Sequence, residues 1–167
     1  MAELTQKERL QPSLLDRLTD DEPGKQQESR DQRVLSMRRL RASVLRDLAW
    51  LLNSRSLDSA ENLDHYPQVA RSVVNFGIKD LSGVTASGAN MAALERRLKQ
   101  AILNFEPRIM PNSLRVQAVS SDEKMSVRTL SFNIEGYLWA QPLPVHLYIR
   151  TEFDVQTGDA DVRELNG

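Results

Sequence analysis

The carboxylates of this chain are the residues whose type and position could support catalysis. The candidates for a pair that hydrolyses a glycosidic bond are Glu106, Glu135, Glu152 and Asp154. Such a pair faces across a cleft, about 5–5.5 Å or about 6.5–9.5 Å apart depending on the stereochemical outcome. Three of the four alternate with apolar residues in strand-like segments, which places them on a polar, solvated face. The sequence also offers no aromatic cluster to stack on sugar rings. Peptidoglycan hydrolysis is therefore the alternative hypothesis, not the leading one.

The triplet Glu106-Pro107-Arg108 is the most informative feature of the sequence. Proline disfavours helical angles at the residue before it, so the preceding helix should end near Phe105. A helix C-terminus carries partial negative charge, which makes Glu106 unfavourable there and Arg108 favourable. In an extended segment the two side chains would lie side by side, roughly 6–7 Å apart. We interpret the triplet as a protein-docking element. The competing interpretation is a surface ion pair worth at most ~1 kcal/mol.

No cofactor or metal site is predicted. The chain has no cysteine, and its two histidines, His65 and His146, have no second ligand at metal-binding spacing. Gly83 and Gly88 lack the third position and the lysine of a phosphate-binding loop.

The first long helix of the predicted fold is rich in arginine. Nucleic-acid binding requires such a patch to be interleaved with stacking aromatics, and none occurs before Trp50. A solvated or protein-facing helix surface is the favoured interpretation. The arginines are Arg30, Arg33, Arg38, Arg39, Arg41 and Arg46.

Arg41 conflicts with its local pattern, because it falls inside the apolar arc of this helix. One interpretation is that its stem is buried while its charged head reaches water. The other is that it meets a carboxylate, either Glu106 or one from a partner.

Length and composition indicate one domain with a substantial core. The chain has 167 residues and a formal net charge of −1, and a chain of this size buries roughly 68–70% of its unfolded surface. No basic stretch followed by an apolar core is seen at the start, and no apolar run approaches ~18 residues. We expect a soluble, intracellular protein. We divide it into an N-terminal docking segment and acidic linker over residues 1–28, partly flexible, and a single domain over residues 29–167.

Helical periodicity predicts four helices. A two-turn helix spans residues 12–18, and the linker at 19–28 contains Pro23-Gly24. The capping-box pattern at residues 29–32 opens a long helix that ends near Asn53. A short helix runs from Pro67 to about Val74 and is closed by Gly77. A second long helix is capped by Ser87 or Asn90 and ends near Phe105.

After Pro111 the apolar period changes from helical to two. Three strands are predicted, over residues 114–119, 129–134 and 145–155, and they form an antiparallel meander with one apolar face. We predict an α+β fold, a two-layer domain with helices packed on one face of a three-stranded antiparallel sheet. An open edge of such a sheet invites an added strand from a partner.

Several short segments together resemble a known family over about residues 12–155. They are Leu14-Leu15-Asp16-Arg17-Leu18, Ser43-Val44-Leu45-Arg46-Asp47-Leu48, Leu51-Leu52-Asn53, Tyr66-Pro67, Ser72-Val73-Val74-Asn75-Phe76-Gly77 and Phe105-Glu106-Pro107-Arg108. In this order and spacing the chain resembles the TssE family of type VI secretion baseplate subunits. That family is related to the lysozyme-like wedge proteins of contractile phage tails.

The resemblance implies a structural protein and not an enzyme, despite the lysozyme-like label. It implies a cytoplasmic baseplate, docked at the inner-membrane complex, whose wedge contains TssF, TssG and TssK and carries a sheath of TssB and TssC. The Glu-Pro-Arg signature of the family, linked to baseplate and sheath assembly, falls on Glu106, Pro107 and Arg108. With Arg41, these residues form the predicted protein-binding site.

Overall fold

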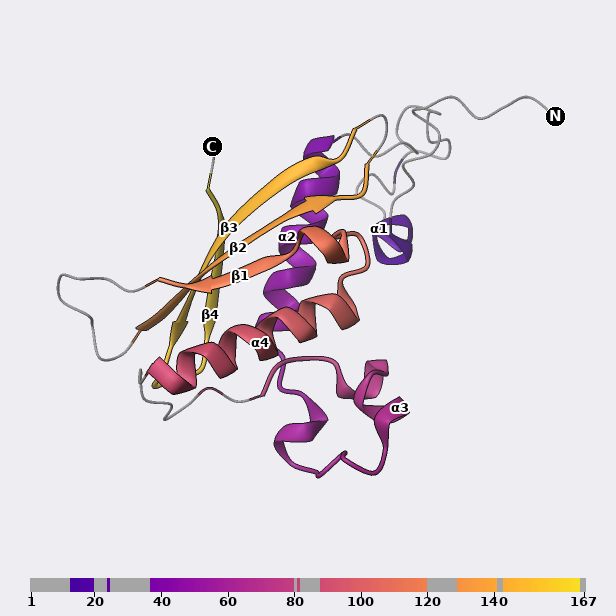
Figure 1. Ribbon diagram of the computed structural model, residues 1–167. Coiled ribbons are helices and arrows are strands. Elements are labelled where there is room, and N and C mark those ends of the chain that lie inside the picture. Colours follow the sequence, from indigo (N-terminus) through magenta and orange to yellow (C-terminus); the bar gives the residue numbers. More distant parts are fainter. Residues whose placement is uncertain are drawn as a thin grey trace.

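The computed structural model describes residues 13–19, 24, 37–79, 81, 88–119, 129–140 and 143–165. Two long helices and an antiparallel sheet dominate them (Figure 1). The helices are α1 (Leu14–Leu18), α2 (Met37–Asn53), α3 (Pro67–Ala70) and α4 (Gly88–Phe105), and the short 3-10 helices are η2 (Leu57–Ser59), η3 (Val73–Asn75) and η4 (Pro111–Ser113). The strands are β1 (Arg115–Ala118), β2 (Thr129–Leu138), β3 (Val145–Asp154) and β4 (Ala160–Glu164).

The sheet has four strands in the order β1-β2-β3-β4, all antiparallel. The α+β class is confirmed, but the predicted strand number of three is wrong. The missed strand, β4, has five residues, and three of them are charged: Asp161, Arg163 and Glu164. None of its five residues is fully buried, so its apolar alternation is too weak to be recognised. β4 now forms one edge of the sheet, and β3 is interior.

One face of the sheet is buried against both long helices. In β2, every second residue from Leu130 to Leu138 is buried, and β3 shows the same alternation over its core positions. α4 contacts β1 and α2 contacts β4, and their apolar residues join those of the strands in one core. Within it, the rings of Phe132 and Phe153 meet edge to face with centroids 5.8 Å apart. The two-layer prediction is therefore confirmed.

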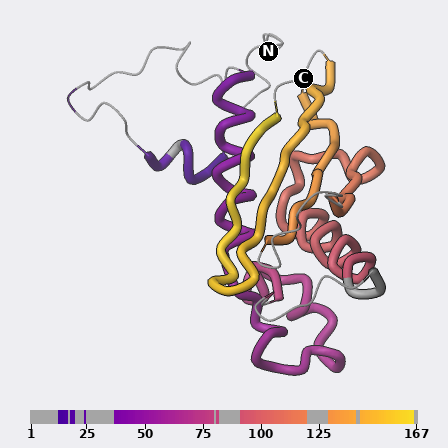
Figure 2. Tube along the Cα trace, turned by 90° about the vertical axis from the view of Figure 1, so that its left-hand side faces the viewer, coloured from indigo at the N-terminus to yellow at the C-terminus, as the bar shows by residue number. Residues whose placement is uncertain are grey.

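The last residue of α2 closes one end of the sheet edge. α2 runs alongside β4 (Figure 2). The Asn53 side-chain amide donates to the Ala160 carbonyl at 2.9 Å, and its oxygen accepts the Ala160 N–H at 2.9 Å. A side chain thus forms with Ala160 the two bonds that a neighbouring strand would form.

Residues 54–78 form an excursion whose two ends are held together. The Ser56 N–H donates to the Ile78 carbonyl at 3.0 Å, and the Ile78 N–H donates to the Ser54 carbonyl at 2.9 Å. Gly77, directly before Ile78, has a φ of 125°, and a Cβ there would meet the Ser54 oxygen at 2.5 Å. Only glycine fits here without strain. The prediction that Gly77 closes the helix from Pro67 is wrong, because that helix ends at Ala70 and Gly77 instead permits the close approach to Ser54.

The C-terminal ends of the two long helices agree with the prediction, whereas the end of the short helix does not. α2 ends at Asn53 and α4 at Phe105, as predicted. The short helix that begins at Pro67 stops at Ala70, and Val73–Asn75 forms a separate 3-10 turn. Asn90, one of the two predicted caps, lies inside α4.

Several predictions fall outside the described residues. They concern Ser87, the capping box at 29–32 and most of the linker at 19–28. In the part of the chain that the structure covers, no helix combines the length and apolar character needed to cross a membrane.

Candidate functional site

The Glu106-Pro107-Arg108 triplet forms a tight turn at the end of α4, not the extended segment that we predicted. The Glu106 N–H still donates to the Ile102 carbonyl at 2.8 Å, as in a helix, and the Ile109 N–H donates to the Glu106 carbonyl at 3.2 Å. Pro107 therefore occupies the second position of a four-residue turn, where its fixed φ is favourable. The turn, and not a strand pleat, brings Glu106 and Arg108 together.

The Glu106 carboxylate is buried and is bound by its own chain. The residue is only 3% exposed. Its Oε1 accepts hydrogen bonds from the Arg108 backbone N–H at 3.1 Å and from Arg108 Nε at 2.7 Å, and its Oε2 accepts from Arg108 Nη2. This two-pronged contact is the geometry in which arginine binds a carboxylate most strongly. The unfavourable position at the helix end is thus compensated within the molecule.

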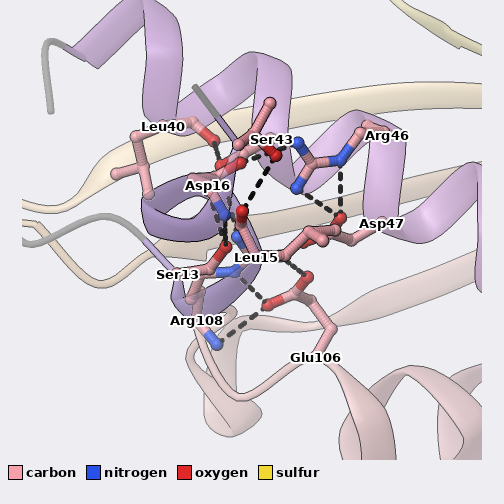
Figure 3. A network of polar contacts seen from close by, with 10 residues as sticks. Ser13, Leu15, Asp16, Leu40, Ser43, Arg46, Asp47, Glu106 and Arg108 are labelled. Atoms are coloured by element: carbon pink, nitrogen blue, oxygen red, sulfur yellow. Dashed lines mark hydrogen bonds and ion pairs between the residues drawn. The ribbon is translucent and has the colours of Figure 1, made fainter. Parts of the chain in front are cut away.

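Arg108 also ties the turn to α2. Its Nη2 donates to Asp47 Oδ2 at 2.6 Å and its Nη1 to Ser43 Oγ at 3.2 Å (Figure 3). Burial lowers the pKa of Arg108, but the hydrogen bonds and charges of Glu106 and then Asp47 outweigh that effect and raise the pKa above its usual value. The guanidinium therefore stays charged and binds two carboxylates, that of Asp47 in α2 and that of Glu106 just after α4.

The network continues from α2 to α1. Arg46 pairs with Asp47 at 2.8 Å and with Asp16 of α1 at 2.7 Å. Ser13 caps α1, since its hydroxyl accepts the Asp16 N–H at 3.3 Å and donates to the Asp16 carboxylate at 2.7 Å. Acidic and basic side chains alternate along the whole path, in the order Asp16, Arg46, Asp47, Arg108 and Glu106 (Figure 3). We call this row of ion pairs the charge relay, a name that refers only to the alternation of charge.

The first carboxylate of the relay has a lowered pKa. Desolvation raises the pKa of Asp16, but hydrogen bonds from Ser13 and Arg46, together with the Arg46 charge, shift it below its usual value of 3.8. Asp16 is therefore ionised whenever α1 is docked near neutral pH.

A cavity of about 270 Å³ lies between the relay and the core. Its walls are mainly apolar and come from α1, α2, the end of α4 and the loop after η3. Phe76 and Phe105 meet edge to face there, with ring centroids 5.3 Å apart. On the side of α1, Leu15 lines the cavity while remaining 42% exposed.

Arg41, the fourth predicted binding residue, lies away from the relay. Its Nη1 is paired with Glu164 of β4, and its Nη2 donates to the His146 carbonyl at 3.0 Å. It therefore meets a carboxylate, as one interpretation required, but this carboxylate is neither Glu106 nor a partner's. Protein binding by Arg41, Glu106, Pro107 and Arg108 stays a prediction.

The other carboxylates considered for catalysis are scattered. Glu135 contacts His146 Nε2 at 3.0 Å, and Glu152 lies 3.6 Å from Arg150. Asp154 caps the turn that leads to β4, accepting the Gln156 N–H at 2.7 Å. None of them joins Glu106 in the cavity. Among the described residues, no group of three or more potential ligands could hold a metal ion.

Sequence reasoning missed the partners of Arg108. Asp47 lies 61 residues away in the chain and Ser43 lies 65 away, and nothing local connects them to the triplet. The available signal was Asp47, the single acidic residue of the arginine-rich helix α2. It lies four positions after Ser43 and therefore on the same face of the helix.

Comparison with known proteins identifies the family at this point. The profile of the family described as baseplate wedge protein gp25 matches residues 38–143. No curated protein matches the chain. The matched region contains α2 from its second residue, α4, β1, β2 and the charge relay from Arg46 to Glu106, which agrees with the resemblance seen in the sequence. The chain belongs to the baseplate wedge protein gp25 family, a family of structural baseplate proteins.

Proposed function

We propose that this chain is a non-enzymatic structural subunit of a type VI secretion baseplate that joins the wedge complex to the contractile sheath and promotes sheath assembly. The observation that carries the proposal is that Glu106 is buried and bound by Arg108. A carboxylate that is 3% exposed and bound through both oxygens by Arg108 is not placed to contact a substrate. With the family assignment, this favours a structural role for the triplet over a catalytic one.

The role that we assign to the triplet is to shape a surface. Pro107 is exposed while Glu106 is sealed beneath it, so a partner would touch the turn and not the carboxylate. The Arg108 contacts to α2 hold the turn in one position. The proposed partners are the wedge subunits TssF, TssG and TssK and the sheath subunits TssB and TssC. The proposed location is a cytoplasmic baseplate at the inner-membrane complex.

We further assign the sheath contact to the outer edge of β4, the side that does not pair with β3. Bonding alternates along an antiparallel strand. The Leu165 N–H donates to Tyr148 of β3, whereas the Ala160 N–H points away to Asn53. By this alternation, the N–H groups of Val162 and Glu164 also point away from β3. An extended segment of a sheath subunit could pair with them and so extend the sheet.

The test uses proline placed at two adjacent positions. Val162→Pro removes an outward N–H, so the fold should persist while co-purification with sheath subunits and the frequency of sheath tubes in cells fall. Arg163→Pro removes an inward N–H and is the matched control, which should destabilise the sheet itself. Normal sheath tubes with Val162→Pro would contradict the strand-addition step.

The hydrolase alternative has its own test. The purified chain should release no soluble fragments from peptidoglycan, and Glu106→Gln should not change that result. Release that depends on Glu106 would overturn the structural assignment.

A further inference from the structure

The cavity beside the charge relay is only partly filled by the helix that covers it. Leu15 lines the cavity but keeps 42% of its surface exposed, and about 270 Å³ remains open beneath it. The walls include Leu48, Leu51 and Phe105. This space is partly open to solvent, so α1 covers only part of its apolar walls, and each missing contact there is lost stabilisation. The covering helix therefore fits its site poorly.

The attachment of α1 is also weak. A helix of five residues is not stable alone in water, and the ion pair of its Asp16 to α2 involves Arg46, whose side chain is 34% exposed. Pairs of this kind contribute roughly 0–1 kcal/mol. On the outer side of α1, Leu14 and Leu18 are 70% and 74% exposed. Docking of α1 leaves most of its apolar surface in water.

The rim of the cavity selects the chemistry of an occupant. Trp50 lines the cavity, and the Arg46 guanidinium lies 5.1 Å from the centroid of its ring. Arg46 binds Asp16, the residue that directly follows Leu15. The site thus binds a segment with two adjacent residues, an apolar one whose side chain lines the cavity and an acidic one whose carboxylate contacts Arg46.

We propose that this cavity is a docking site for a short helical segment of a partner protein that carries a large apolar residue followed by a carboxylate. α1 occupies the site in the free protein, and the partner segment displaces it. A side chain larger than leucine fills more of the open volume, and its carboxylate replaces Asp16 on Arg46. The proposal concerns the isolated chain and does not rest on the baseplate role.

The test measures binding of a peptide in trans to the full chain. The peptide has the sequence of residues 11–19 with Leu15→Phe, and its ends are blocked. The chain carries Trp139→Phe, which leaves Trp50 as its only tryptophan. We expect a saturable change in Trp50 fluorescence. A second chain that also carries Asp16→Arg, which weakens its own α1, should bind the peptide at least threefold more tightly, because a larger fraction of its sites is open.

Charge reversal provides the matched control. Arg46→Asp in the chain should abolish binding of the acidic peptide, and a peptide that also carries Asp16→Arg should bind this chain. Circular dichroism and thermal unfolding establish that each chain is folded. If Arg46→Asp does not fold, Arg46→Gln replaces it, and this chain should no longer distinguish the acidic peptide from one carrying Asp16→Asn. The proposal is overturned if the Asp16→Arg chain shows no binding at millimolar peptide, or if affinity is indifferent to residue 46.

Discussion

Arg108 and Asp47 lie 61 residues apart in the chain and are joined by a 2.6 Å contact between Nη2 and Oδ2. The same guanidinium closes on Glu106, two residues before it. One cation thus fastens the end of α4 to the middle of α2. Loss of the Arg108 guanidinium should therefore affect both the stability of the chain and its assembly with partners.

Arg108→Ala should strongly destabilise the fold, because it leaves Glu106 buried without its counter-charge. Breaking a buried pair by removing one partner costs about 3–5 kcal/mol. For a chain of this length that corresponds to a fall in melting temperature of roughly 6–20 °C. Thermal and urea unfolding measure it. Arg163→Ala is the control, since the Arg163 side chain is 74% exposed and surface changes usually stay within about 0.5 kcal/mol.

The double change Glu106→Gln with Arg108→Met should recover much of that stability, because no uncompensated charge remains. If the double variant also fails to assemble with wedge and sheath subunits, the chemistry of the triplet, and not stability alone, is needed for assembly. Equal stability of Arg108→Ala and the unmodified chain would contradict the buried-pair argument.

The docking of α1 should depend on pH through Asp16. The pKa of Asp16 is lowered when α1 is docked. The stabilisation that ionised Asp16 gives to docking is therefore fully present above about pH 3.8, and it is lost as pH falls through the lower pKa of the docked state. Hydrogen exchange of residues 14–18 between pH 5 and pH 2.5 measures this. In Asp16→Asn, α1 should be less protected at pH 5 and show no such step. Constant protection of α1 in the unmodified chain, with the fold intact, would contradict the role of Asp16.

Arg41 offers a direct distinction between an internal and an external role. Its pair with Glu164 is partly exposed, and such pairs contribute up to about 1 kcal/mol. If the role is internal, Arg41→Ala and Glu164→Gln should lower stability by similar small amounts and change partner co-purification equally. A loss of co-purification with Arg41→Ala alone would instead assign Arg41 to a partner contact.

Gly77→Ala should destabilise the base of the excursion at residues 54–78. The positive φ and the approach of a Cβ to the Ser54 oxygen both oppose it, with a cost of order 1–3 kcal/mol. Gly24→Ala is the matched control, because a Cβ there has no atom within 4 Å. Unfolding curves that coincide for the two variants would show that the backbone at Gly77 can relax.

The parts of the fold with strong periodicity could be predicted from the sequence. The C-terminal ends of α2 and α4 and the interior strands β2 and β3 follow from apolar spacing, because their buried faces are long enough to leave a pattern. β4 could not be found, because a short edge strand buries little. The error also affected Arg41, whose internal partner Glu164 lies on that strand.

The internal pairing of the triplet could be predicted from the sequence, whereas its role in binding a partner stays a prediction. The pairing of Glu106 with Arg108 was expected as the competing interpretation, and it is present. Its burial could not be predicted, because it depends on Ser43 and Asp47 in a distant helix. Local electrostatics places a carboxylate at a helix end in solvent. Here the compensating charge comes from Arg108, two residues away, and the tertiary contacts of Arg108 to α2 hold that pair in a buried position.

The amide of Asn53 bound to the backbone of Ala160 limits how the sheet could grow. A chain that joined the β4 border would find the first position taken and would have to begin at Val162. Register in a sheet is otherwise prone to slip by two residues without changing which face is buried. A single occupied position at this edge would therefore give every incoming strand the same starting point on β4, and its own apolar pattern would set the rest of the register.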